Sequence, residues 1–438
     1  MATKRVLILE HHLLPSIFQK FPWSDFIDED DDIELYILTS TDGLTEKDKS
    51  CKYVRAYEEL VHPTTDGKLE LLSLEMHKKY SFTHVYTKSE DFIMRAAHIR
   101  SLIGIDTGLT AESVAPYRDK VQMKLIASQG GFPVPPFTRI YTPATLIGFI
   151  EKYGYPVVVK SILGRGTSGV RLLKTKEDLE KFLSEDLFDG INSQQRVDLV
   201  GEFIVEKFVS GRMFHINGIA QEGKIICAWP FTYISTCLDF VTNGLAYGNS
   251  SVPRSNPLHD RLRQTAQRLL EIFPALPKTL AFHIELFENP DKNHLVDDDF
   301  VLCEIAARGP GGTIRKLIDM LSFDKDKNQS FSRLEFRASV SLPILPLSDV
   351  NEEMVVTDLI VPLKKGKLMY IPQECPIEHL FYMPLMKVEK SMNYEKFNTF
   401  AINSACIFIA NTKTMEEGKQ LVERGLQWFE SESITMIP

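Results

Sequence analysis

The segment from Tyr155 to Lys174, YPVVVKSILGRGTSGVRLLK, contains a glycine-rich loop between two apolar runs. The glycines of GRGTSG have the spacing G-x-G-x-x-G, which dinucleotide-binding folds place between a strand and a helix. Here the run before the loop, 157–159, and the run after it, 170–173, both have the composition of strands. The segment therefore predicts a hairpin flap over phosphates, because glycines let backbone N–H groups approach anionic oxygens closely. For this segment taken alone, an ordinary hairpin turn is the alternative.

The composition is that of a globular protein long enough for about two to four domains. The chain has 438 residues, of which 44% are hydrophobic and 25% charged, and its formal net charge is -9. This acidic balance argues against nucleic acid or an anionic membrane as the main partner, although a local basic site is compatible with it.

The cysteine pattern and the N-terminal residues bear on localisation. The six cysteines are widely spaced and include no C-x-x-C pair, which suits reduced thiols better than a disulfide framework or a zinc site. The first apolar run, Val6–Leu9, spans four residues, so we expect neither a signal peptide nor a membrane span there. These features predict a cytoplasmic protein.

The first hundred residues alternate strand-like and helical patterns, which predicts a small parallel α/β domain. Strands are expected at 6–9, 35–38 and 83–87, and a helix at 69–79; the five acids at 28–32 predict a solvated loop. Further along, helices are expected at 117–129, 142–154, 176–187 and 258–273, and strands at 203–208, 213–220, 224–231, 355–362 and 405–410. A last helix is expected to begin with a capping box formed by Thr414 and Glu417.

Two later segments, 281–287 and 300–308, carry charged side chains at strand spacing. Strand alternation places His283 and Glu285 on one face of the first segment and aligns Glu304 with Arg308 in the second. The connection between them is rich in Asn, Pro and Asp, so we expect the strands to pair antiparallel. Both glutamates would then be aimed at one cleft.

Two carboxylates on a buried sheet repel each other and resist desolvation unless a cation lies between them. Mg²⁺ suits this position because it takes oxygen ligands and is usually shared with nucleotide phosphates. Arg308 has the chemistry to stabilise charge on a transferred phosphoryl group or a tetrahedral centre. A surface cluster of salt bridges is the alternative for either glutamate alone. Combined with Arg308, the glycines of 309–312 and the flap, the pair favours a nucleotide site.

With these motifs in this order, the sequence resembles the ATP-grasp superfamily of carboxylate–amine ligases, and within it the L-amino-acid ligases that make dipeptides. The resemblance runs from about Phe82 to Gly312 and continues more weakly to the C-terminus. Besides the flap, it rests on YRDKVQMK at 117–124, GYPVVVK at 154–160, EKFV at 206–209, FHIE at 282–285 and EIAAR at 304–308.

The resemblance implies an ATP-grasp fold of class α/β, with α+β character in part. Its N-terminal parallel α/β domain would span 1–114, and the ATP-grasp domain would span 115–321. Within the latter, the flap would occupy 160–170 and the metal-binding strands 280–308. A C-terminal antiparallel-sheet domain at 322–438 would complete the sheet.

The resemblance also implies a set of site residues, with ATP and Mg²⁺ as cofactors, Mn²⁺ as a substitute, and amino acids as substrates. Lys160 and Arg308 would be catalytic, Glu285 and Glu304 would hold the metal, and a homodimer is a further expectation. The residues implied in nucleotide binding are Lys120, Lys160, Gly166, Thr167, Ser168, Glu206, Lys207, Val209 and His215. Of these, 206–209 would line the adenine, with backbone atoms of Lys207 and Val209 reading its edge; for His215, a buried structural role is the alternative.

Two positions depart from the pattern of the superfamily. Ala306 stands where Glu-x-Asn-x-Arg would supply an amide oxygen to a metal, and Met213 stands where an acidic residue often lies near the ribose. Neither departure argues against nucleotide binding, but both change which residues are expected to contact the metal and the ribose.

Several other functions remain to be weighed. A protein kinase is disfavoured because H-R-D and D-F-G motifs are missing, and the G-x-x-x-x-G-K match at 218–224 is followed by Ile225 instead of Ser or Thr. A biotin-type or purine-pathway enzyme that activates bicarbonate or formate is the main enzymatic alternative. A non-catalytic ATP-binding module is the alternative from another class.

Overall fold

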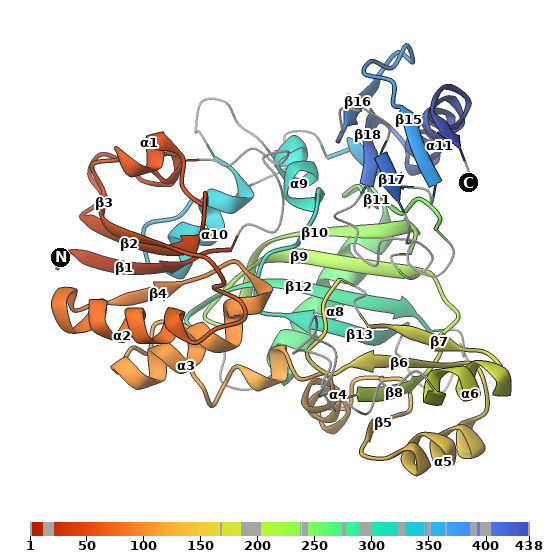
Figure 1. Ribbon diagram of the computed structural model, residues 1–438, viewed down its shortest axis with the longest axis horizontal. Helices are drawn as coiled ribbons and strands as arrows, with labels where there is room; N and C mark the ends of the chain where they lie inside the picture. Colours follow the sequence, from red (N-terminus) through yellow and green to blue (C-terminus); the bar gives the residue numbers. More distant parts are fainter. Residues whose placement is uncertain are drawn as a thin grey trace.

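The computed structural model describes residues 2–11, 22–166, 169–184, 203–236, 238, 244–273, 277–289, 299–322, 329–345, 347, 352–363, 366–385, 392–394 and 404–436. Figure 1 shows an N-terminal lobe at the left, a large central sheet, a small sheet with its helices at the lower right, and the C-terminal elements at the upper right. The central sheet lies between the other parts, so segments from distant parts of the chain meet along it.

The N-terminal lobe is built on a parallel sheet of order β3-β2-β1-β4. Its elements are β1 (Lys4–Leu9), η1 (Trp23–Phe26), β2 (Ile33–Ser40), α1 (Glu46–Lys49), β3 (Val54–Leu60), α2 (Lys68–Tyr80), β4 (His84–Tyr86), η2 (Glu90–Phe92) and α3 (Ile93–Ile103). The parallel α/β prediction is confirmed. Strand β3 was not predicted, because its mostly polar sequence VRAYEEL lies at the sheet edge, where several of its side chains are exposed.

The acidic run at 28–32 is a loop, as predicted, but two of its carboxylates form ion pairs as well as meeting solvent. Asp28 accepts from Arg333 at 2.5 Å, and Asp31 accepts from Arg337 at 2.5 Å. Both arginines lie on α10 (Phe331–Ser339), a helix whose Phe336 is fully buried in the core of the N-terminal sheet. A segment more than 300 residues away in sequence therefore completes this lobe.

The flap and its neighbours form a small antiparallel sheet of order β5-β8-β6-β7. The elements of this part are η3 (Ala115–Tyr117), α4 (Lys120–Gln129), β5 (Phe137–Ile140), α5 (Pro143–Tyr153), β6 (Val157–Ser161), β7 (Arg171–Leu173), α6 (Lys176–Ser184) and β8 (Phe203–Lys207). The strand–loop–strand prediction for the flap is confirmed, since β6 pairs with β7. Gly166 and Gly169 have φ angles of 55° and 73°, in the left-handed region that favours glycine.

Helix α4 begins three residues later than the sequence predicts. Asp119 is its N-cap, and the Asp119 carboxylate accepts from the N–H groups of Val121 and Gln122 at 2.9 and 3.0 Å. Since the first helical residue is Lys120, Lys124 follows one turn later on the same face. This local capping therefore aligns two lysines toward the centre of the molecule.

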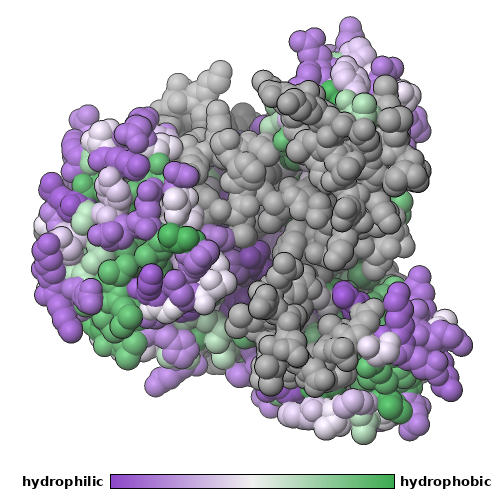
Figure 2. Space-filling view, in the orientation of Figure 1, coloured by the Kyte–Doolittle hydropathy of each residue, from purple (hydrophilic) through white to green (hydrophobic). Residues whose placement is uncertain are grey.

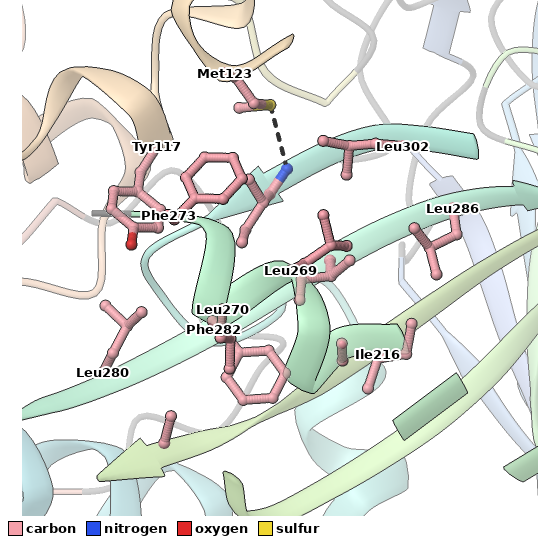
Figure 3. Packing of buried hydrophobic residues seen from close by; sticks show 14 of the residues in the cluster. Tyr117, Met123, Ile216, Leu269, Leu270, Phe273, Leu280, Phe282, Leu286 and Leu302 are labelled. Atoms are coloured by element: carbon pink, nitrogen blue, oxygen red, sulfur yellow. Dashed lines mark hydrogen bonds between the residues drawn. The ribbon is translucent and has the colours of Figure 1, made fainter. Parts of the chain in front are cut away.

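A large antiparallel sheet of order β13-β12-β9-β10-β11-β14-β18-β16 forms the centre. Its strands are β9 (Met213–Gln221), β10 (Lys224–Ser235), β11 (Gly248–Ser251), β12 (Thr279–Glu288), β13 (Phe300–Ala306), β14 (Val355–Pro362), β16 (Leu380–Pro384) and β18 (Ser404–Thr412). Helices α8 (Pro257–Ile272) and α4 contact each other and pack on this sheet, α8 against β9 and β10 and α4 against β13. Figure 3 shows part of this core, where Met123 Sδ accepts the backbone N–H of Ile305 at 3.3 Å. Phe282 of β12 belongs to the same cluster as Leu269 of α8 and Phe273, which follows that helix.

The C-terminal elements complete the other end of this sheet and add a second, three-stranded one of order β17-β15-β19. They are α9 (Ile314–Ser322), β15 (Gly366–Tyr370), β17 (Met392–Tyr394), α11 (Met415–Glu432) and β19 (Ile434–Met436). Thr414 caps α11 as predicted, accepting from the N–H of Glu417 at 3.2 Å. The reciprocal bond of the capping box is displaced, because the Glu417 carboxylate accepts from the N–H of Lys413.

In the part of the chain that the structure describes, no helix combines the length and the apolar composition that a bilayer crossing requires. In the face shown in Figure 2, hydrophilic residues cover much of the N-terminal and small-sheet regions, with apolar residues between them.

Replacing Phe336 with Ala should destabilise the N-terminal lobe by about 3–5 kcal/mol, the usual cost of a buried Phe-to-Ala change. Phe336 is 0% exposed and contacts the rings of Trp23, Phe26 and Tyr86, so its removal leaves a cavity between α10 and the sheet. Urea and thermal unfolding measure the effect. Phe381→Ala, at a side chain that is 50% exposed, is the control; equal losses at both positions would contradict this account of the lobe.

Candidate functional site

Glu285 and Glu304 face each other on neighbouring strands, as the sequence predicts. They are direct partners in the antiparallel register of β12 and β13. Glu285 accepts from the Tyr233 hydroxyl at 2.6 Å and lies 3.4 Å from Nε2 of His283. Burial raises the pKa of Glu285, but the contacts with His283 and Tyr233 outweigh burial and lower it to about 2. Both carboxylates keep some exposure, 18% for Glu285 and 21% for Glu304, so a ligand can reach the pair.

Lys120 connects this acidic pair to the flap. Its Nζ donates to the carbonyl of Gly164 at 2.7 Å and lies 3.4 Å from Oε2 of Glu304. The backbone N–H of Lys120 also donates to the carbonyl of Ile162 at 3.3 Å. The start of α4, the base of the flap and strand β13 therefore meet at one lysine.

Lys160 lies in a second charged group with Glu206 and Lys124. Glu206 is 2% exposed, and its two carboxylate oxygens lie 2.9 Å from Lys160 Nζ and 3.4 Å from Lys124 Nζ. Lys124 also donates to the carbonyl of Cys303 at 3.0 Å, beside Glu304 on β13. Burial raises the pKa of Glu206, but the two ammonium groups outweigh burial and lower it. The Glu206 side chain therefore neutralises lysines, and of this residue only the backbone is available to line an adenine.

Arg308 lies beyond the end of β13, since the strand ends at Ala306 and not at 308 as the alternation predicts. Its Nε donates to Oε2 of Glu90, and Glu90 Oε1 lies 2.5 Å from Nη1 of Arg118. Burial raises the pKa of Glu90, but the two guanidinium groups outweigh burial and lower it to about 2. Arg118 also donates to the carbonyl of Leu163, so the N-terminal lobe, the flap base and Arg308 are joined through one carboxylate.

The tip of the flap is held against the N-terminal lobe. Arg165 makes two parallel contacts of 2.6 Å with the Asp91 carboxylate, a bidentate geometry that fixes orientation as well as distance. Gly166 follows in the left-handed conformation. The predicted nucleotide contacts Thr167 and Ser168 lie outside the residues that the structure describes.

Lys207 and Val209 lie at the end of β8, where the chain leaves the small sheet. The backbone N–H of Lys207 donates to the carbonyl of Pro136, and its Nζ donates to the carbonyl of Tyr155 at 2.9 Å. The Lys207 side chain therefore contacts the segment that precedes β6. Nucleotide recognition by this segment would rest on backbone atoms, as the resemblance implies.

His215 does not lie where a nucleotide can contact it. The side chain is fully buried on β9 and stacks on Phe231, with ring centroids 5.1 Å apart. Both ring nitrogens are hydrogen-bonded, Nε2 with Asn249 at 3.0 Å and Nδ1 with Asn217 at 2.9 Å. Burial lowers the pKa of His215 to about 3, so the ring is neutral. These contacts fit the structural alternative for His215, and not the nucleotide contact that the resemblance implies.

Comparison with known proteins agrees with this architecture. The family described as the ATP-binding domain of the carbamoyl-phosphate synthase L chain matches residues 119–213. Across 100% of this chain and 99% of the other, the structure is similar to an L-amino acid ligase from Bacillus licheniformis, with a TM-score of 0.68 and 15% identity. The chain has the ATP-grasp fold.

Two other relatives widen the range of chemistry found on this ATP-grasp fold. An L-arginine-specific L-amino acid ligase from Bacillus subtilis is 23% identical over 253 residues, 57% of either chain, so the match spans little more than half of that protein. The biotin carboxylase domain of the 2-oxoglutarate carboxylase from Hydrogenobacter thermophilus is similar with a TM-score of 0.64 and 12% identity, over 99% of this chain and 90% of that one. It was determined as a dimer with MgADP and bicarbonate.

The residues that the structure brings to the site and that the sequence did not indicate include Glu90, Asp91 and Arg118. Arg118 lies within the motif at 117–124, but only folding reveals its partner. Glu90 and Asp91 follow β4, and ligands of open α/β sheets bind beyond the carboxyl ends of strands, so the end of β4 was the available signal.

The donor set fits a magnesium ion shared with phosphates. Two carboxylates in direct register supply hard oxygen ligands, and Mg²⁺ usually takes one or two carboxylates and completes its shell with water and phosphate oxygens. In the described ranges, no group of three or more His, Cys, Asp or Glu side chains is placed to hold a metal ion. Ala306, the methyl in place of the usual amide, pairs with His283 in the same register.

Replacing Glu206 with Gln should destabilise the protein by about 3–5 kcal/mol at neutral pH, because it leaves two buried ammonium groups without their anion. Folding lowers the pKa of Glu206. The ionised carboxylate therefore stabilises the folded protein fully at pH values above the pKa of an unfolded glutamate, and this stabilisation is lost as the pH falls through the lower pKa of the folded state. The difference between wild type and variant should therefore shrink in acid, as measured by urea unfolding from pH 7 to 3.5. Glu271→Gln, in an exposed pair with Lys224, is the matched control and should change little; a pH-independent loss at Glu206 would refute the ionic origin.

Proposed function

We propose that this protein is an ATP-dependent ligase that joins the carboxylate of one L-amino acid to the amine of another, releasing ADP and phosphate. The observation that carries the proposal is the direct register of Glu285 and Glu304 beneath a glycine flap, with Lys120 between them and the flap base. The similarity to two L-amino acid ligases supports the choice of substrates.

In the first step, a substrate carboxylate oxygen attacks the γ-phosphorus of ATP, and the bond to the leaving ADP oxygen breaks. Lys120 and Lys160 supply positive charge for the phosphates, and the flap around Gly166, with Thr167 and Ser168, supplies backbone N–H donors. The backbone of 206–209 lines the adenine. When bound by Glu285 and Glu304, Mg²⁺ (or Mn²⁺) would neutralise charge on the phosphate oxygens.

In the second step, the amine nitrogen of the other amino acid attacks the acyl carbon, the bond from that carbon to the phosphate oxygen breaks, and the departing phosphate takes the proton that the amine loses. Arg308 binds the phosphoryl group in both steps, and its position is held by Glu90. Arg165 and Asp91 hold the flap closed, which keeps water from the acyl phosphate. Holding the reactants together supplies an effective concentration of about 10⁵ M or more.

The proposal can be tested by measuring phosphate release with ATP and Mg²⁺ for all twenty amino acids, singly and in pairs, with mass spectrometry of the products. A dipeptide mass in a responsive pair is the expected result. Bicarbonate and formate are measured in parallel, because the related carboxylase domain was determined with bicarbonate. Phosphate release with these anions alone would replace the dipeptide proposal with the carboxylase or purine-pathway alternative. If the protein binds ADP but releases no phosphate with any substrate, a non-catalytic ATP-binding module would be favoured.

Glu304→Gln should lower phosphate release by about 10²-fold or more, the usual scale for losing one electrostatic group at a reacting centre. The change keeps the size of the side chain and removes the negative charge next to Glu285 and Lys120. Glu288→Gln is the matched control, since Glu288 lies on the same strand as Glu285 but pairs with Arg212 away from this site. Near-normal turnover of Glu304→Gln would show that the metal lies elsewhere.

A further inference from the structure

A continuous line of polar side chains crosses the buried centre of the large sheet and ends at Glu285. Its members come from four strands and are all largely inaccessible to solvent. In order they are Asp358 on β14, Asn249 on β11, His215 and Asn217 on β9, and His283 and Glu285 on β12. The proposed metal site uses only the last of them.

The first links run from Asp358 to His215. Oδ1 of Asp358 accepts both the backbone N–H and the side-chain amide of Asn249, at 2.7 and 2.8 Å. The amide oxygen of Asn249 then lies 3.0 Å from Nε2 of His215. Because the Asn249 nitrogen already donates to an acid, its oxygen is the acceptor, and His215 must carry its proton on Nε2.

The remaining links run from His215 to Glu285. Nδ1 of His215 has no proton in this tautomer and accepts the amide nitrogen of Asn217 at 2.9 Å. The Asn217 oxygen therefore accepts Nδ1–H of His283 at 2.7 Å. The other nitrogen of His283 lies 3.4 Å from the Glu285 carboxylate. From His283 to Asp358, each group donates in the direction of Asp358, so one orientation satisfies these links. The contact between Nε2 of His283 and Glu285 is an ion pair when the ring carries both protons.

Asp358 also reaches the other side of the proposed site. Its second oxygen accepts the hydroxyl of Thr313, a residue that is 1% exposed. Thr313 directly follows the glycine-rich loop 309–312, which begins after Arg308. The same line of bonds thus connects a candidate metal ligand with the segment that carries the proposed phosphoryl-binding arginine.

A polar chain of this kind is costly in a sheet interior unless every member is paired, so its presence needs an explanation. Stability alone is a weak explanation, because apolar side chains would fill the same positions without desolvation cost. Orientation is a stronger explanation, because a second shell of hydrogen bonds fixes the direction of a metal-ligating carboxylate and tunes the affinity of the site for the metal.

We propose that Asn249, Asn217 and His283 are positioning residues that orient Glu285 for a divalent cation, with Asp358 as the anchor of the chain. The inference rests on the proposed function, because it takes Glu285 as a metal ligand. It extends that function by assigning a role to side chains as far as β14, which contact neither metal nor nucleotide.

The experiment measures Mn²⁺ binding to the full-length protein with ADP, from the electron paramagnetic resonance signal of free Mn²⁺, below the melting temperature of each variant. Asn217→Ala and Asp358→Ala should each raise the dissociation constant of Mn²⁺ by about tenfold, the lower end of the range for lost second-shell partners. Asp358→Asn should restore near-wild-type binding, because its oxygen can still accept from Asn249 and its nitrogen can donate to Thr313.

Ser250→Ala is the matched control, since the Ser250 hydroxyl bonds Thr357 at 2.9 Å between the same two strands, one residue along from Asn249 and Asp358. This variant should bind Mn²⁺ as wild type does. If the Ala variants do not fold, Asn217→Ser and Asn249→Ser are measured in their place, because each leaves a smaller cavity and still removes the amide.

The outcomes separate this inference from the proposed function. Wild type that binds no Mn²⁺ in the presence of ADP would overturn both. If the folded Asn217 and Asp358 variants bind Mn²⁺ as tightly as wild type and only their melting temperatures fall, the positioning role is overturned and the metal site stands. Weakened binding in Ser250→Ala to the same degree would also overturn it, since the effect would then belong to the sheet as a whole.

Discussion

The repulsion between two glutamates in direct register on β12 and β13 is the constraint around which the centre of this molecule is arranged. Neither carboxylate could remain ionised there without compensating groups. Lys120 stands beside Glu304, while Tyr233 and His283 contact Glu285. These partners come from a helix and from two strands of the sheet. The contacts of Glu285 lower the pKa of that carboxyl to about 2, and Lys120 places a cation beside Glu304, so each glutamate has its own compensating group.

The same principle of compensated charge holds the lobes together. Glu90 from the N-terminal lobe lies between Arg308 and Arg118, and Glu206 from the small sheet lies between Lys160 and Lys124. In each case one buried acid neutralises two cations that belong to different segments. Such groups are costly to separate, because any partner left behind is a buried, unpaired charge. The proposed chemistry is therefore placed where the parts of the chain are tied most firmly to one another.

Much of the fold and part of the candidate site could be predicted from local patterns. The strands around the flap and the pairing of Glu285 with Glu304 follow from alternation over a short connection, where register is determined nearby. Predictions that required distant partners were less successful. His215 has the spacing of a ligand-facing residue, but it is fully buried against Phe231 and hydrogen-bonded to Asn217 and Asn249. The start of α4 was missed because Asp119 acts as a cap, and its position moved Lys120 to the first turn.

The sequence by itself determined the strand–glycine loop–strand flap, the two acidic strands and the order of the motifs between them, because each of these depends on residues close together in the chain. The tertiary structure alone decided which charges meet. Glu90 and Arg308 are 218 residues apart, and Asp358 joins Asn249 across 109. No local periodicity encodes such pairs, since they arise only when the sheet order brings β11 beside β14 and the end of β4 beside the end of β13. The flap is thus visible in the sequence, whereas what holds it and the carboxylates in place is a property of the fold.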